Sequence, residues 1–114
     1  MNFLSKFFFI FLIFFTELIS EDLIDDETYY LNGVKLYEQG NFKESFIIFF
    51  NLSEKGNKDA IYNVSNMYLE GIGTTQNYYK SLEYTWLCSL NGNKKCIKKL
   101  KKVKEKLAEE EVIE

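Results

Sequence analysis

Two cysteines, Cys88 and Cys96, carry the most reactive side chains of this chain. A cysteine thiolate serves as a nucleophile, a redox group or a metal ligand. The sequence contains no histidine, which excludes Ser-His-Asp and Cys-His catalysis and removes the commonest metal ligand. Redox pairs are usually C-x-x-C at a helix start, whereas these cysteines are eight residues apart. We therefore expect a structural bridge, with a redox pair and two free thiols as alternatives, and no catalytic residue, cofactor or metal.

The segment that contains the cysteines is a second copy of an earlier one. The stretch from Leu52 to Ala60, LSEKGNKDA, recurs 36 residues later as CSLNGNKKC. The cysteines replace Leu52 and Ala60, and both copies keep a Gly-Asn-Lys core. A fixed period of this size is typical of stacked copies of one supersecondary unit. The matched replacement suggests that the two positions touch.

The first twenty residues have the layout of a secretory signal peptide. Lys6 precedes nine apolar residues, 7–15, and polar residues follow up to Ser20, as in such peptides. Nine helical residues reach about 14 Å, against roughly 30 Å of hydrocarbon. We therefore expect residues 1–20 to be a signal peptide cleaved after Ser20, with a retained anchor as the alternative. The mature chain is then periplasmic or secreted and does not span a membrane, and an oxidising compartment favours a disulfide.

The charged residues limit the kinds of partner. The formal net charge is -3 and arginine is absent. Because bidentate phosphate and guanine contacts depend on arginine, we expect no nucleic-acid partner. Residues 94–106 hold eight lysines and one glutamate. We interpret them as the solvated face of a helix, with contact to anionic lipid or polymer as the alternative.

Glycine and asparagine divide the rest of the chain into helices. Gly-Asn pairs follow three apolar segments, where glycine is the usual helix stop, and Asn57 and Asn93 are suited to cap the next helix. We expect an all-α fold, an α/α solenoid of two helix-turn-helix repeats plus a C-terminal capping helix, over residues 29–108. An acidic flexible lead-in, 21–28, precedes it and an acidic tail, 109–114, follows it. The expected helices are Tyr29–Gln39, Phe42–Lys55, Lys58–Leu69, Tyr78–Asn91 and one that starts near Lys94.

Further matches relate the two repeats. Residues 37–40 align with 68–71 at an offset of 31, and Ser45 aligns with Ser81 at an offset of 36. The difference of five residues corresponds to the longer loop of the second repeat. Such loop insertions fit a solenoid, in which each helix pair contacts only its neighbours.

The second repeat carries a recognisable motif. From Ala60 the chain reads AIYNVSNMY, followed by GIG at 71–73 and NYYKS at 77–81. This segment resembles the SEL-one-like repeat (SLR), a branch of the tetratricopeptide-type helical repeats, whose pattern is A-x-x-x-L-G-x-x-Y-x-x-G-x-G-V-x-x-D-x-x-K-A. The identical motif positions are Tyr68, Gly71, Gly73, Lys80 and, further on, Gly92, while Val64, Ser65, Asn77 and Ser81 are conservative replacements.

The resemblance implies a function in binding. SLR proteins generally serve as scaffolds or adaptors, so a non-enzymatic protein with a protein or peptide partner is implied. The partner would lie on the face lined by the first helix of each pair. The candidate partner-binding residues on that face are Tyr37, Asn63, Asn66, Met67 and Tyr68.

The cysteine spacing is similar to that of the exported cysteine-rich SLR proteins of bacteria. In that group a bridge ties the second helix of one repeat to the first helix of the next, which implies a Cys88–Cys96 disulfide. Some members are described as binding and slowly hydrolysing β-lactams, so a weak β-lactamase-like hydrolase is the alternative function. The chain lacks the S-x-x-K, S-D-N and K-T-G set of the serine enzymes. A self-associating subunit is a further alternative, because the helix from Phe42 to Phe50 is apolar nearly all round.

Overall fold

The computed structural model describes residues 2–20 and 25–113. Within these ranges the chain is helical and contains no strand. The predicted cleavage point after Ser20 and residues 21–24 of the predicted lead-in lie at or inside the stretch outside the described residues. The rest of the predicted lead-in is ordered, with Asp25 as a helix cap and 26–28 in a helix. No helix among the described residues is long and apolar enough to cross a membrane. The helices are α1 (Phe3–Ser20), α2 (Asp26–Glu38), α3 (Phe42–Glu54), α4 (Lys58–Glu70), α5 (Tyr78–Leu90) and α6 (Lys94–Ile113).

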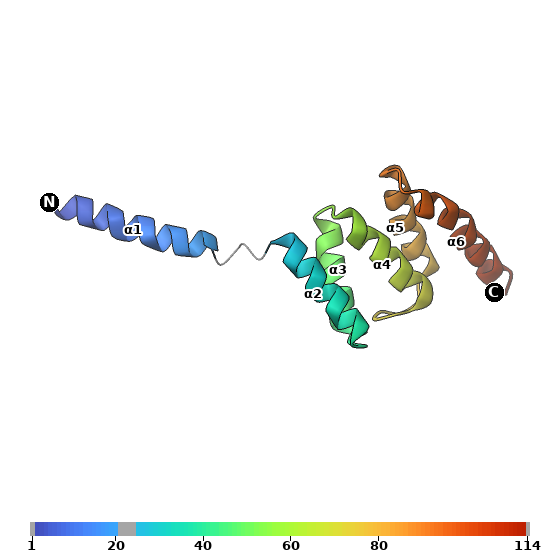
Figure 1. Ribbon diagram of the computed structural model, residues 1–114. Coiled ribbons are helices and arrows are strands. Elements are labelled where there is room, and N and C mark those ends of the chain that lie inside the picture. The colour runs from blue at the N-terminus through green and yellow to red at the C-terminus, as the bar shows by residue number, and fades with distance from the viewer. Residues whose placement is uncertain (1, 21–24, 114) are drawn as a thin grey trace.

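Helices α2 to α6 form two helical hairpins and a capping helix. Each helix packs mainly against its neighbours in sequence, and Figure 1 shows the five helices stacked side by side, with α1 set apart from them. This is the arrangement of an α/α solenoid. The predicted fold class is therefore confirmed. The large apolar side chains of α1 from Phe3 to Phe14 are exposed, and its role as a signal peptide stays a prediction.

The capping residues explain where the helices begin. Asn57 Oδ1 accepts a hydrogen bond from the Ala60 N–H at 2.9 Å, and Asn93 Oδ1 accepts from the Lys95 N–H at 2.9 Å, as predicted. α2 begins at Asp26, three residues before the predicted start, because the Asp25 side chain caps it. α6 continues to Ile113, so the described part of the predicted acidic tail is helical.

The buried crossing within each hairpin relates the two first helices by an offset of 32 residues. α2 and α4 are both 13 residues long and begin 32 residues apart, at Asp26 and Lys58. This offset makes Gly33 equivalent to Ser65, and the contacts agree. The Ser45 hydroxyl donates to the Gly33 carbonyl at 2.7 Å, and the Ser81 hydroxyl donates to the Ser65 carbonyl at 2.9 Å. The predicted offset of 36 for Ser45 and Ser81 therefore holds.

The predicted offset of 31 holds at the ends of the first helices, where Gly40 and Gly71 both have a positive φ. There the Asn41 N–H donates to the Leu36 carbonyl, and the Ile72 N–H donates to the Met67 carbonyl.

The structure brings the two cysteines together at disulfide distance. The Cα atoms of Cys88 and Cys96 are 5.8 Å apart, within the range a disulfide needs. The bridge ties the last turn of α5 to the first turn of α6. The equivalent residues between α3 and α4 are Leu52 and Ala60, and all four side chains are almost completely buried. One buried position thus holds an apolar contact in the first copy and a covalent link in the second.

Replacement of the cysteines should separate the covalent contribution from packing. We expect the double variant Cys88→Leu/Cys96→Ala, which copies the first repeat, to lose about 2.5 kcal/mol of unfolding free energy, the value for closing a short loop. Urea unfolding of the oxidised wild type, the reduced wild type and this variant measures it. A variant as stable as the oxidised wild type would show that the bridge adds nothing beyond packing.

The loop between α4 and α5 contains a glycine that no other residue can replace without strain. Gly73 has a φ of 71°, and a Cβ atom there would overlap the carbonyl oxygen of Phe42 and lie 2.7 Å from its carbonyl carbon. Phe42 is the first residue of α3. The G-x-G loop of the second repeat is therefore seated on the start of the second helix of the first repeat.

The substitution Gly73→Ala should be more destabilising than an alanine at another positive-φ glycine. Gly40 has a φ of 79°, and an added Cβ would meet nothing within 4 Å. Gly40→Ala should cost about 1–2 kcal/mol of unfolding free energy for the left-handed backbone alone. Gly73→Ala should cost about 1–3 kcal/mol more, because the loop must move off α3. Equal denaturation midpoints for the two variants would contradict this account.

Candidate functional site

A pocket opens between the first helices of the two hairpins. Its volume is about 290 Å³, and α2, α3, α4 and the α4–α5 loop supply its lining. We call this pocket the groove. Its lining residues are Tyr30, Val34, Tyr37, Phe49, Asn63, Asn66, Met67 and Ile72.

Four of the five predicted partner-binding residues line the groove. Tyr37 comes from α2, and Asn63, Asn66 and Met67 come from α4. The structure adds four residues that were missed, Tyr30, Val34, Phe49 and Ile72, of which Tyr30 and Val34 come from α2. These two lie seven and three residues before Tyr37, which is helical spacing for one face, so the spacing could have identified them.

Tyr68, the fifth predicted residue, lies on a different side of α4. Its ring packs edge-on to Phe46 with centroids 5.3 Å apart, and it stacks on Tyr84 at 5.8 Å. One residue along a helix turns the side chain by about 100°, which takes it from the groove to the layer between α3 and α5. Its side chain therefore holds the two hairpins together and does not line the groove.

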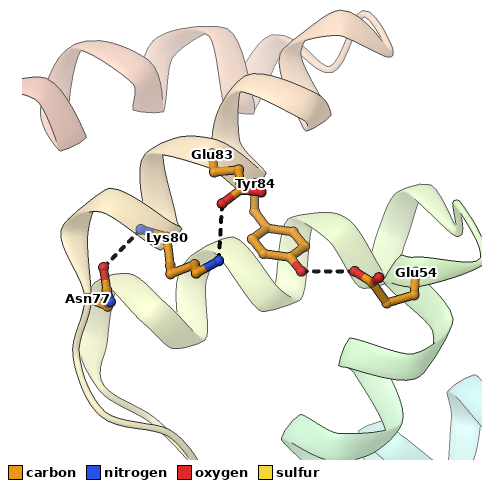
Figure 2. A network of polar contacts seen from close by, with 5 residues as sticks. All are labelled: Glu54, Asn77, Lys80, Glu83 and Tyr84. Carbon is orange, nitrogen blue, oxygen red and sulfur yellow. Dashed lines mark hydrogen bonds and ion pairs between the residues drawn. The ribbon is translucent and has the colours of Figure 1, made fainter.

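A hydrogen bond completes that aromatic layer. Figure 2 shows Tyr84 of α5 reaching Glu54 at the end of α3, where its hydroxyl donates to Oε1 at 3.1 Å. Burial, together with the bond to this carboxylate, raises the pKa of Tyr84 to about 12. The same view shows Asn77 capping α5 through the Lys80 N–H at 2.9 Å. The Tyr84–Glu54 bond joins the second hairpin to the first, and the Asn77 cap fixes the start of α5.

Neighbouring first helices contact each other through one repeated pair of positions. The Asn63 amide Nδ2 of α4 donates to the Tyr30 hydroxyl of α2 at 3.0 Å. At the equivalent positions one step along the stack, Lys99 of α6 places its Nζ 4.3 Å from the ring centroid of Tyr62. A tyrosine on one first helix thus contacts the next first helix at both steps.

Among the lysines of the described residues, Lys99 has the pKa that departs most from its ordinary value. Its Nζ donates to the Ser65 hydroxyl at 2.8 Å and to the Asn66 side-chain oxygen. Burial, and secondly the charge of Lys102, lower the pKa of Lys99 to about 8, while Glu70 acts in the opposite direction. Because the ammonium group needs an acceptor, it fixes the Asn66 amide with its oxygen toward α6.

The groove is equipped for binding. Its lining offers phenol and amide groups for hydrogen bonds and apolar groups for packing, and contains no carboxylate, amine or thiol. Among residues 2–20 and 25–113, no cluster of histidine, cysteine, aspartate and glutamate could hold a metal ion. Comparisons of the chain with protein-family models, with curated proteins and with solved structures give no match. The resemblance to SLR proteins therefore stays a prediction from the residues.

The titration of Lys99 should appear in the pH dependence of stability. Above about pH 8 the native protein releases the Lys99 proton, whereas the unfolded chain keeps it up to about pH 10. The unfolded state then binds more protons at this site, so the contribution of Lys99 to stability rises with pH in this window. We expect the urea midpoint of the wild type, relative to that of Lys99→Met, to rise between about pH 8 and pH 10. A difference that does not change with pH would contradict the burial of this ammonium group.

Proposed function

We propose that this chain is an exported, non-enzymatic repeat protein of the SLR type that holds an extended segment of another protein in the groove. The observation that carries the proposal is the groove itself, a pocket of about 290 Å³ that is lined by tyrosine, asparagine and apolar side chains. A rigid stack of helices that presents such a surface suits the binding of a peptide segment. The paired cysteines fit an oxidising compartment.

The apolar part of the lining suits a side chain of the partner. Phe49 is 2 % exposed and Met67 is 2 % exposed, so both form the floor of the groove. Val34 and Ile72 lie at its sides. Burial of an aliphatic or aromatic side chain at this floor would contribute about 1.5–3 kcal/mol to binding.

The polar part of the lining suits a peptide backbone. Asn63 uses its Nδ2 on Tyr30 and keeps its side-chain oxygen as an acceptor. Asn66 gives its oxygen to Lys99 and keeps its Nδ2 as a donor. A peptide unit offers one N–H donor and one carbonyl acceptor, so one free acceptor and one free donor in the same groove match it.

Replacement of one groove amide should weaken binding without unfolding the protein. Peptides selected from a random library against the oxidised protein should bind Asn63→Ala about two- to tenfold more weakly, the effect of one lost hydrogen bond. The matched control is Asn32→Ala, because Asn32 lies exposed on α2 and outside the groove lining. Fluorescence anisotropy of the labelled peptides measures the affinities. Selected peptides that bind both variants as tightly as the wild type would show that the groove is not the binding site.

Self-association is a second candidate function, favoured by the surface at the C-terminal end of the stack. Trp86, Leu90 and Ile97 are each more than half exposed there. Phe46 and Phe50 of the Phe-rich helix instead pack between the hairpins. Light scattering measures the molar mass of the protein over a range of concentrations. A mass that rises with concentration indicates a self-associating subunit, and a constant monomer mass indicates a monomeric adaptor.

A further inference from the structure

The residue type at two equivalent positions changes from each first helix to the next along the stack. Leu31 and Val34 lie one and four residues after Tyr30 on α2. Asn63 and Asn66 lie one and four residues after the equivalent tyrosine, Tyr62, on α4. The offset of 36 residues between α4 and α6, which begin at Lys58 and Lys94, gives the third pair, Lys99 and Lys102. Equivalent positions are thus apolar on α2, amide on α4 and cationic on α6.

The lysines of α6 form a stripe that borders the groove. Lys95, Lys99, Lys102 and Lys106 follow one another at intervals of four, three and four residues, so they share one side of the helix. Lys99 donates to Asn66, a lining residue of the groove. The stripe therefore begins where the groove lining on α4 ends.

Two of the four lysines in the stripe already contact other residues of the chain. Lys99 is engaged by Ser65, Asn66 and the Tyr62 ring, and Lys106 donates to Glu109 at 2.8 Å.

Lys95 and Lys102 are exposed and form no ion pair with a described residue. Lys102 lies close enough to Lys99 for its charge to be felt there. Lys102 is therefore a cation close to Lys99 at the border of the groove, and Lys95 lies one turn before Lys99 on the same side of α6. The groove lining itself contains no charged residue.

We propose that the groove takes an extended peptide in which an apolar side chain at the α2 end is joined to acidic side chains at the α6 end, where Lys95 and Lys102 contact them. This inference rests on the proposed function and adds the chemistry of the partner. Side-chain contacts join α2 to α4 and α4 to α6. An extended peptide of about six residues, about 20 Å long, therefore serves as the probe for this path.

The lining favours a peptide over a lipid surface as the anionic ligand. The free acceptor of Asn63 and the free donor of Asn66 match a backbone amide, and an acyl chain would leave both without a partner. Burying such groups without hydrogen bonds is unfavourable. The lysine stripe alone would accept either ligand. The Asn63 and Asn66 amides favour the peptide, because they can hydrogen-bond to its backbone.

The test uses synthetic peptides of about six residues, blocked at both ends, with leucine at one end and two glutamates at the other. Because the direction of the chain is open, the peptides are made in both orders, each with a matched version that has glutamine for glutamate. At low salt, one order should bind the oxidised protein about three- to tenfold tighter than its glutamine version, as expected for two exposed ion pairs. The double variant Lys95→Gln/Lys102→Gln should lose that preference and bind both versions equally.

The matched control is Lys101→Gln/Lys104→Gln, which removes the same charge from α6. Lys101 is 86 % exposed in its side chain and pairs with Glu105, and Lys104 lies at the α5 side of the helix. This control should keep the preference for glutamate.

Equal binding of the glutamate and glutamine peptides, with loss of both in Asn63→Ala, would overturn the inference and leave the proposed function intact. No binding of any peptide would overturn both. If Lys95→Gln/Lys102→Gln abolished binding to anionic phospholipid vesicles and left peptide affinities unchanged, the lysines would serve a lipid surface and the inference would be wrong.

Discussion

The close approach of the two helices within each hairpin is the constraint on which the rest of the structure depends. A Cβ atom on Gly33 would lie 2.9 Å from Ile48 Cγ2. The backbone of α2 therefore packs directly against side chains of α3. The hydroxyls of Ser45 and Ser81, both fully buried, close the two crossings with hydrogen bonds to the facing carbonyls. Both hairpins share this crossing, and Leu52 and Val64 are completely buried where they stack.

The crossing position is occupied differently on α6. The residue equivalent to Gly33 and Ser65 is Lys101, whose side chain is 86 % exposed. The next position along this face also differs, since Ile61 is 6 % exposed on α4 and its equivalent Ile97 is 53 % exposed on α6. α6 packs against α5 and contributes the buried side chains of Val103 and Leu107, and the Cys88–Cys96 bridge links the two helices covalently.

Local signals in the sequence were sufficient for the helices and turns, and insufficient for the register between helices. Glycine and asparagine act within a few residues, so the turns were predictable to within a few residues. The alignment of Tyr37 with Tyr68 found the equivalence of the helix ends, where Gly40 and Gly71 are identical in type. It missed the buried crossing at Gly33 and Ser65, whose offset is 32, because these residues differ in type.

The same distinction separates what was predictable in the groove from what was not. Asn63, Asn66 and Met67 share a face of one helix, which a period of 3.6 residues reveals. Whether that face meets Tyr30 or Phe49 depends on the distance and rotation between helices, which the crossing residues determine. Phe49 and Met67 on the groove floor belong to the core, whereas Asn63 and Asn66 are only partly buried, so substitutions at these two amides disturb the buried crossing least. Asn63 and Asn66 are therefore the part of the groove in which a binding preference can be encoded with the least effect on folding.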